Sequence, residues 1–242
     1  MAQTSGPSRV TGVAPVSDTL SLWPTPIGLH HYPEADDLNP LLVRVLQSLR
    51  AVDTSADPAR PFYASSDDLL NRIRIPEWQA WVRFLIESIG KTARVANAHA
   101  WPESSEDLSV DIRGLWFQIS NHGVHHDVHS HGNCSWSGVY VVQVDPDASR
   151  EHHPIYASRN GVTRFYGPHF HSLAGALMDY GNAYLQQAHI DIAPMPGRLL
   201  VFPSWLLHQA MPYQGSQDRI ILSFNASLHR VGGDQWARYA AS

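Results

Sequence analysis

Hydrophobic residues recur at helical spacing in two segments of the N-terminal half of the chain. The first stripe, within residues 40 to 50, consists of Leu41, Leu42, Val45, Leu46 and Leu49. Asn39 followed by Pro40 is typical of a helix N-terminus, because the amide can cap the helix and proline suits its first position. The second stripe, within residues 76 to 96, consists of Trp78, Trp81, Val82, Leu85, Ile86 and Ile89. We therefore expect two amphipathic helices that cover an apolar surface.

From residue 111 onward the pattern indicates β-structure. Short runs rich in Val, Ile, Tyr, Phe and Trp alternate with Gly, Pro, Asn and Asp. The predicted strands are residues 112–120, 124–131, 136–144, 162–166, 188–193, 198–202, 207–213 and 218–228. Short strands after two helices predict a mainly β fold, a double-stranded β-helix (jelly roll) with flanking N-terminal helices. Residues 53–68 are expected to be loop, and the long irregular segment 145–187 is expected to be a functional loop.

Length, charge and cysteine content narrow the class of protein. The chain of 242 residues suffices for one core, so we expect a flexible tail over residues 1–18 and a single domain over residues 19–242. No signal peptide and no membrane span are expected, because no suitable apolar stretch is found. The net charge of -5 disfavours a nucleic-acid partner. Cys134 is the single cysteine, which excludes an internal disulfide and favours a cytoplasmic location.

Histidines mark the candidate metal centre. His129 and His131 share one face of a predicted strand, and His208 on a distant strand would complete a triangle of imidazoles. Such a set suits iron, zinc, copper or nickel, so these three residues are the predicted metal ligands and catalytic centre. Spacing alone does not decide the set, because His125 and Asp127 share the same parity. A solvated, histidine-rich edge strand is the alternative without a metal.

Arg219 opens a strand whose two faces differ in polarity. Arg219, Ser223 and Asn225 share one face with Ile221, while Ile220, Leu222 and Phe224 take the other. Buried polar groups need partners, and the planar guanidinium suits a carboxylate. We therefore expect Arg219, Ser223 and Asn225 to bind an anionic co-substrate inside the barrel. Asp218 or Asp191 could instead pair with Arg219 at the rim.

Aromatic residues close to these strands are candidates for pocket walls. They are Trp116, Trp136, Tyr140 and Trp205. Core packing is favoured for each of them individually, but Tyr140 is also a candidate cofactor-binding residue.

Several separated segments resemble a family of 2-oxoglutarate/Fe(II) oxygenases found mainly in bacteria. Residues 129–140 resemble its H-x-H-x(5)-SGVY signature. Residues 197–204 with His208 resemble its G-x-L-x-x-FPSWL and H signatures, and residues 219–225 resemble R-I-x-x-SFN. The opening Leu-Trp-Pro-Thr-Pro segment and the first predicted helix are also similar, so the resemblance extends over about residues 20 to 229.

The resemblance implies Fe(II) as the metal and 2-oxoglutarate as co-substrate. By position, His129, His131 and His208 would be the metal residues, and Arg219 would bind the distal carboxylate of 2-oxoglutarate. The implied reaction oxidises, most simply hydroxylates, a C–H bond of a small-molecule substrate and releases succinate and CO2.

Two other functions are compatible with a site of three histidines. A three-His dioxygenase of cupin type would need no 2-oxoglutarate, although cupins usually carry a Glu shortly after H-x-H and residues 132–138 contain none. A non-catalytic jelly roll would bind zinc with all four positions filled.

Overall fold

A computed structural model describes residues 25–98, 101, 108–167 and 188–230. The tail predicted for residues 1–18 lies outside the described residues. The helices are α1 (Ala35–Val52), α2 (Pro76–Ala96) and α3 (Asp147–Glu151), with short 3-10 turns at Leu69–Asn71 and Ala157–Arg159. The strands are β1 (Gly28–His31), β2 (Phe62–Ala64), β3 (Leu108–Ser120), β4 (Trp136–Gln143), β5 (Thr163–Tyr166), β6 (His189–Ile192), β7 (Arg198–Pro203), β8 (His208–Ala210) and β9 (Arg219–Arg230).

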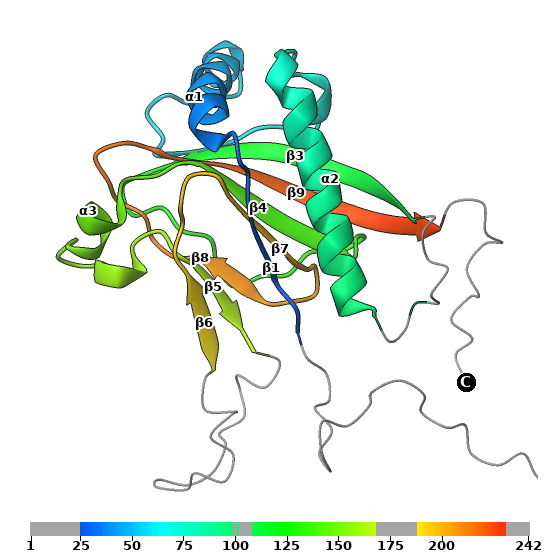
Figure 1. Ribbon diagram of the computed structural model, residues 1–242. Helices are drawn as coiled ribbons and strands as arrows, with labels where there is room; N and C mark the ends of the chain where they lie inside the picture. The colour runs from blue at the N-terminus through cyan, green and yellow to red at the C-terminus, as the bar shows by residue number, and fades with distance from the viewer. Residues whose placement is uncertain (1–24, 99–100, 102–107, 168–187, 231–242) are drawn as a thin grey trace, which may run out of the picture.

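Two antiparallel sheets form the framework. The large sheet has the strand order β1-β7-β4-β9-β3-β2, and the small sheet has the order β6-β5-β8. Helices α1 and α2 lie against one face of the large sheet, and the small sheet lies on the opposite side (Figure 1). This arrangement confirms the predicted jelly roll with N-terminal helices. None of the described helices is long and apolar enough to cross a membrane.

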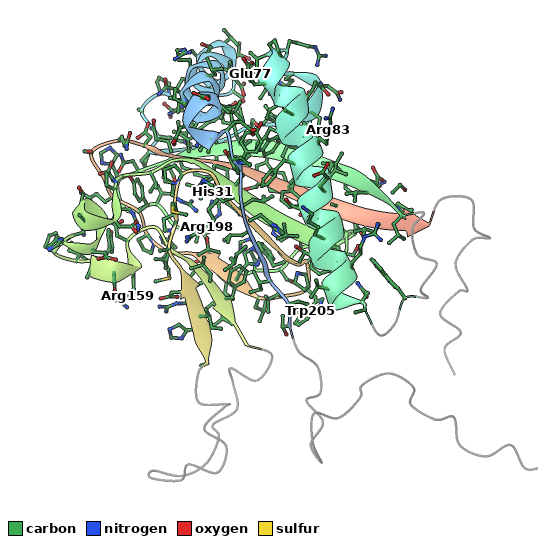
Figure 2. The ribbon with its side chains drawn as sticks, viewed as in Figure 1. His31, Glu77, Arg83, Arg159, Arg198 and Trp205 are labelled. Carbon is green, nitrogen blue, oxygen red and sulfur yellow. The ribbon has the colours of Figure 1, made fainter. Side chains whose placement is uncertain are left out.

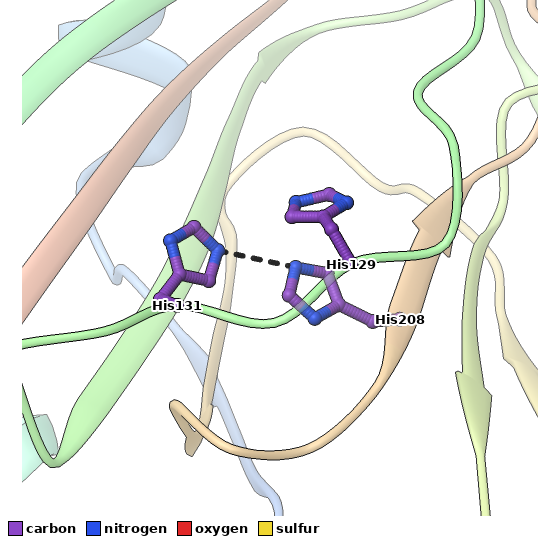
Figure 3. Close-up of side chains that lie close together, drawn as sticks. All are labelled: His129, His131 and His208. Carbon is purple, nitrogen blue, oxygen red and sulfur yellow. Dashed lines mark hydrogen bonds between the residues drawn. The ribbon is translucent and has the colours of Figure 1, made fainter.

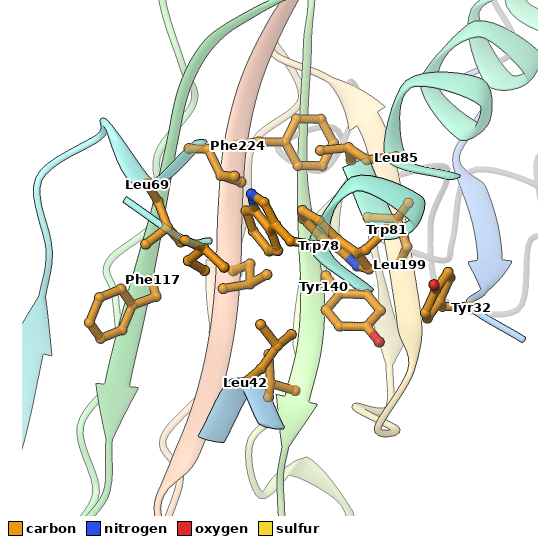
Figure 4. Packing of buried hydrophobic residues seen from close by; sticks show 14 of the residues in the cluster. Tyr32, Leu42, Leu69, Trp78, Trp81, Leu85, Phe117, Tyr140, Leu199 and Phe224 are labelled. Carbon is orange, nitrogen blue, oxygen red and sulfur yellow. The ribbon is translucent and has the colours of Figure 1, made fainter. Parts of the chain in front are cut away.

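The main hydrophobic core lies between the two helices and the large sheet (Figures 2 and 4). Trp78 and Trp81 of α2 are fully buried and stacked, with ring centroids 4.6 Å apart. Trp81 also meets the edge of Tyr140 on β4 at 5.4 Å. Large aromatic groups contribute most to such a core because each removes a large apolar area from water.

The second predicted helix is confirmed over Pro76–Ala96, whereas the predicted start of the first is wrong. Helix α1 begins at Ala35, so Pro40 lies inside it and Asn39 is not its cap. Asn39 is buried and its Oδ1 accepts a hydrogen bond of 2.9 Å from the Tyr140 hydroxyl. Pro40 is on the exposed side, where water can reach the carbonyl that its missing N–H leaves unpaired. The tertiary partner of Asn39 therefore outweighs its preference for a cap.

The strand predicted over residues 124–131 is the main error in the β-region. Only Val124 and His129 form bridges in this segment, to Tyr213 and His208. In register with the His129–His208 pair, Asp127 would lie opposite Ala210. Instead, the N–H of His126 donates to the carbonyl of Ala210, so the regular two-residue alternation is not maintained in this segment. The other predicted strands correspond to β3 to β9 with shifted ends, and β2 lies within residues 53–68, which were expected to be loop. Strand β8 is shorter than predicted, and Pro212, which lacks an N–H, follows it closely.

The alternation predicted for β9 is confirmed. Ile220, Leu222 and Phe224 belong to the core under the helices, while Arg219, Ile221 and Ser223 face a cavity between the two sheets. The same rule corrects the prediction for Tyr140. Tyr140 lies on the helix face of β4, fully buried in the core, and so is not a cofactor-binding residue.

Replacing Tyr140 with Phe should lower the free energy of unfolding by about 1–3 kcal/mol, because the buried amide oxygen of Asn39 would lose its donor. Urea denaturation measures this change. In an Asn39→Ala background the same replacement should cost clearly less, because the pair is already broken. Equal costs in both backgrounds, or impaired metal and co-substrate binding by a stable Tyr140→Phe protein, would contradict the assignment of Tyr140 to the core.

Candidate metal centre

Backbone pairing brings the distant histidines together. The N–H of His129 donates to the carbonyl of His208, and the N–H of His208 donates to the carbonyl of His129, both at 3.0 Å. The N–H of His131 donates to the carbonyl of Ser204 at 2.8 Å. These bonds attach the segment that follows β3 to the turn between β7 and β8. Two separate parts of the sequence are thereby held in register at one point.

The three imidazole rings converge on a common centre (Figure 3). One candidate ligand atom from each of His129, His131 and His208 lies within 4.8 Å of the other two. The ring centroids of His129 and His208 are 4.3 Å apart. The Nε2 atoms of His131 and His208 are 3.3 Å apart. Among the residues that the structure describes, this is the set of His, Cys, Asp and Glu side chains with the geometry of a metal site.

Hydrogen bonds at Nδ1 orient two of the rings. The Nδ1–H of His129 donates to the carbonyl of Asp127 at 2.7 Å, and the Nδ1–H of His208 donates to the carbonyl of Leu206 at 2.9 Å. A neutral imidazole protonated at Nδ1 keeps its Nε2 lone pair free. Orientation by a backbone carbonyl is the usual support of a metal-binding histidine. The donor atoms therefore already present lone pairs to a cation.

The alternative ligands His125 and Asp127 point elsewhere. The Asp127 side chain is 97% exposed and the His125 side chain 49% exposed, and the two groups lie 3.7 Å apart as a surface pair. The irregular backbone between Val124 and His129 explains this outcome, since a one-residue slip reverses the faces of a strand. The solvated edge-strand alternative also fails, because His208 is 5% exposed and its partners converge on it.

Burial lowers the pKa of His126, His131 and His208. Burial lowers the pKa of His208 to about 4, and burial, followed by the nearby His129, lowers the pKa of His131. Burial, followed by the positive charge of Arg219, lowers the pKa of His126 to about 4. Desolvation disfavours the protonated imidazole. A cation does not have to displace protons from His131 or His208 at neutral pH.

Arg219 supplies a buried positive charge to the same cavity. It is 5% exposed, and its Nε has no hydrogen-bond partner in the described part of the chain. Burial lowers the pKa of Arg219 to about 10, so the guanidinium is still charged at neutral pH. The rim alternatives are excluded, because Asp191 binds Arg164 at 2.7 Å and Asp218 accepts from the amide of Asn121 at 3.1 Å. A buried, unpaired charge is costly, which indicates an anionic ligand.

The remaining predicted residues divide between the cavity and its surroundings. Ser223 lines the cavity together with Trp116. Asn225 accepts a hydrogen bond from the Ser137 hydroxyl at 2.8 Å and lines a neighbouring depression instead. Trp136 is part of the core, and Trp205 is 56% exposed (Figure 2).

Sequence reasoning missed several cavity residues, among them His126 and Gln118. His126 lines the wall between His129 and Arg219, with its edge against Phe62 at 5.3 Å. Regular alternation placed His126 on the face opposite His129, so the irregular backbone concealed it. Gln118 also lines the cavity. The signal for Gln118 was present, because it shares the strand face of Trp116 and is a polar residue among apolar neighbours.

The donor set fits a mononuclear metal ion. Three neutral nitrogen donors converge, and the described residues add no carboxylate or thiolate to the group, so positions for further ligands remain open. Imidazole is a suitable ligand for iron. Arg219 lines the same cavity and needs an anion, which fits a co-substrate with a free carboxylate.

Part of the chain matches a known protein family. Residues 114–225 match the family described as "Putative 2OG-Fe(II) oxygenase". No curated protein matches the chain.

Solved structures share the fold at low sequence identity. The non-heme alpha ketoglutarate dependent epimerase SnoN from nogalamycin biosynthesis is 12% identical, with a TM-score of 0.51 over 83% of this chain and 76% of that one. AviO1 from Streptomyces viridochromogenes Tue57 is 12% identical, with a TM-score of 0.51 over 83% and 90%. HygX from Streptomyces hygroscopicus, whose structure contains nickel and 2-oxoglutarate, is 10% identical, with a TM-score of 0.50 over 84% and 82%.

The region matched by the family contains the three histidines and Arg219, and it has the jelly-roll fold of these structures. Over residues 114–225, slightly less than half of the chain, the protein is similar to 2OG-Fe(II) oxygenases, and the three histidines and Arg219 within this region fit a metal ion and an anionic co-substrate.

Proposed function

We propose that His129, His131 and His208 hold the Fe(II), that Arg219 binds the distal carboxylate of 2-oxoglutarate, and that the enzyme hydroxylates a C–H bond of a small molecule. One observation carries this proposal: three convergent imidazoles and a buried, unpaired guanidinium line a single cavity. The metal and the co-substrate then each have a separate set of protein partners.

The histidines position the metal without contributing charge. The carbonyls of Asp127 and Leu206 fix two rings, and the low pKa of His208 keeps its ring unprotonated. Three neutral ligands leave the full charge of the cation available to an anionic co-substrate.

Arg219 orients the co-substrate. The guanidinium is fixed in the wall of the cavity by β9, and its fork suits a carboxylate. His126 lies beside Arg219 and is neutral, because its pKa is lowered to about 4. The positive charge at this end of the cavity therefore comes from Arg219. Ser223 and Gln118 add polar groups to the wall.

When bound, iron and 2-oxoglutarate supply the oxidising chemistry, in which O2 is consumed, succinate and CO2 are released and a C–H bond of the substrate becomes C–OH. The protein positions the metal and the anionic co-substrate in one cavity. A small-molecule substrate is supported by the confined cavity and by the net charge of -5, which disfavours nucleic acid. The single cysteine supports the expected cytoplasmic location.

The two other functions account for less of the site. A three-His dioxygenase that does not use 2-oxoglutarate would leave the buried charge of Arg219 without a ligand. A structural zinc site would require a fourth protein ligand, and the described residues provide three.

Replacing His208 with Ala should weaken Fe(II) binding by more than the roughly 10–100-fold cost of changing an outer-shell partner, because a direct ligand is lost. Anaerobic calorimetric titration with Fe(II) measures this. His125→Ala is the matched control, since His125 lies on the exposed surface beside the site, and it should bind like the parent. Parent-like binding by a folded His208→Ala protein would contradict the ligand assignment.

Replacing Arg219 with Met should raise the dissociation constant for 2-oxoglutarate about 10–100-fold, the usual worth of hydrogen bonds to a charged group. The weak visible absorption band formed by Fe(II) and 2-oxoglutarate without oxygen provides the titration. The ligand-free variant should be at least as stable as the parent, because an unpaired buried charge is removed.

Arg164→Met is the matched control for this variant, because Arg164 already pairs with Asp191. It should leave the affinity for 2-oxoglutarate unchanged. The role of Arg219 is contradicted if both variants bind 2-oxoglutarate like the parent, or if only the Arg219 variant unfolds more readily without ligand.

The metal-free protein should lose stability in acid. The pKa values of His208 and His126 lie at about 4 in the folded protein, below the ordinary value of 6.5. Between these values the unfolded chain takes up protons that the folded chain does not, so the free energy of unfolding should fall as pH decreases from 6.5 and level off below about 4. Chemical denaturation at several pH values measures the slope.

The variant His126→Gln/His208→Gln should flatten this dependence, whereas His125→Gln should not. A slope unchanged by the double replacement would show that these histidines are not held neutral in the fold.

A further inference from the structure

A second depression opens beside the metal centre, on the same face of the large sheet. It has a volume of about 220 Å³ and is lined by Asp67, Arg113, Gly114, Trp116, Asn133 and Asn225, with Gly132 and Cys134 completing the wall. Trp116 also lines the cavity of the histidines, and its ring centroid lies 6.4 Å from that of His131. The two spaces are therefore neighbours across one side chain.

Strands β3 and β9 continue the cavity into this depression. Trp116 pairs with Ser223, and Gly114 pairs with Asn225, one step further along the same face. Arg219 lies at the opposite end of this row, six residues from Asn225, or about 20 Å along the strand. Arg219, the proposed co-substrate residue, and Asn225 in the depression thus lie at opposite ends of this row of residues. Trp116 and Ser223 lie between them, and Trp116 is the residue close to His131.

One carboxylate in the depression has no partner. No hydrogen bond or ion pair involves the Asp67 side chain in the described part of the chain, whereas Arg113 is paired with Asp111 at 2.9 Å. Asn133 and Asn225 contribute neutral amides. The unbalanced charge of the depression is therefore the single negative charge of Asp67.

The backbone fixes Asp67 at this position. The N–H of Leu115 donates to the carbonyl of Asp67 at 2.8 Å, and the N–H of Phe117 donates to the hydroxyl of Ser65 at 3.1 Å. Gly114 allows the carboxylate to lie over the strand. A Cβ at that position would stand 3.2 Å from the Cβ of Asp67, which is closer than is usual for packed carbon atoms, and it would also contact the carboxylate Oδ2.

We propose that this depression is a substrate subsite that binds a positively charged nitrogen, through the carboxylate of Asp67 and the ring of Trp116. The inference rests on the proposed function, because the substrate would reach the metal centre past Trp116 and His131. An ammonium group would pair with Asp67, and the indole face attracts cations. The substrate class is therefore a small molecule that carries an amine or a guanidine a short distance from the C–H bond that is oxidised.

The test compares three probes of similar shape and different charge: phenethylamine, N-acetylphenethylamine and 3-phenylpropionate. Ligand-observed NMR titration measures their binding to the full chain loaded with Zn(II) and 2-oxoglutarate, which does not turn over, and to the metal-free protein. The amine should bind about fivefold more tightly than the amide, the upper range for an exposed ion pair. Added salt should reduce this preference.

Asp67→Asn should abolish the preference for the amine in both forms of the protein. Asp68→Asn is the matched control, because the neighbouring carboxylate faces Arg72 and lies outside the depression, and it should keep the preference. Equal binding of the amide, tighter binding of the carboxylate, or an undiminished preference in Asp67→Asn would overturn the subsite. A parent protein that prefers the amine but binds no Fe(II) would support the cation site and overturn the proposed function.

Discussion

The pairing of His129 with His208 is the constraint on which the active centre depends. Two backbone hydrogen bonds of 3.0 Å join residues that are far apart in the sequence, and each residue carries an imidazole on the cavity side. His131 follows two residues later and is held by the carbonyl of Ser204. The ring geometry is therefore a consequence of strand pairing rather than of side-chain contacts alone. Such rigid support keeps ligands close to their binding geometry before the metal arrives.

The two faces of the large sheet have different roles: one face packs in the hydrophobic core, and the other lines the candidate site. Its outer face carries apolar residues that pack under α1 and α2, with the tryptophan pair of α2 at the centre. Its inner face carries Arg219, Ser223, Gln118 and Trp116. The packing of α1 and α2 against the outer face provides the hydrophobic stabilisation. The inner face can therefore carry polar groups whose burial lowers the stability of the fold. The unpaired charge of Arg219 is the largest of these costs, and a carboxylate ligand would offset it.

Periodicity in the sequence predicts the faces of regular elements well. The limits of α2 and the alternation of β9 follow from it, because each element buries one continuous apolar stripe. Periodicity did not select the metal ligands, because His125 and Asp127 share the parity of His129 and His131. The family resemblance selected His129, His131 and His208, and the structure brings these three side chains together.

Irregular backbone and tertiary contacts limit the prediction. The segment from Val124 to His129 does not alternate regularly, so the sequence did not reveal that His126 lines the cavity, and it left His125 as an alternative metal ligand although His125 lies on the surface. Local preference placed a cap at Asn39, whereas a contact with Tyr140 a hundred and one residues away decides its role. Arg219 is left without a carboxylate partner among the described residues because the fold places Asp191 and Asp218 against other groups, and the sequence alone does not reveal this.

The most direct test of the central claim is a crystal structure of the full chain grown without oxygen in the presence of Fe(II) and 2-oxoglutarate. The account predicts one metal ion bound by the Nε2 atoms of His129, His131 and His208, with a carboxylate of 2-oxoglutarate on the guanidinium of Arg219. Metal bound by His125 or Asp127, or an Arg219 that remains without an anion while 2-oxoglutarate binds elsewhere, would contradict it.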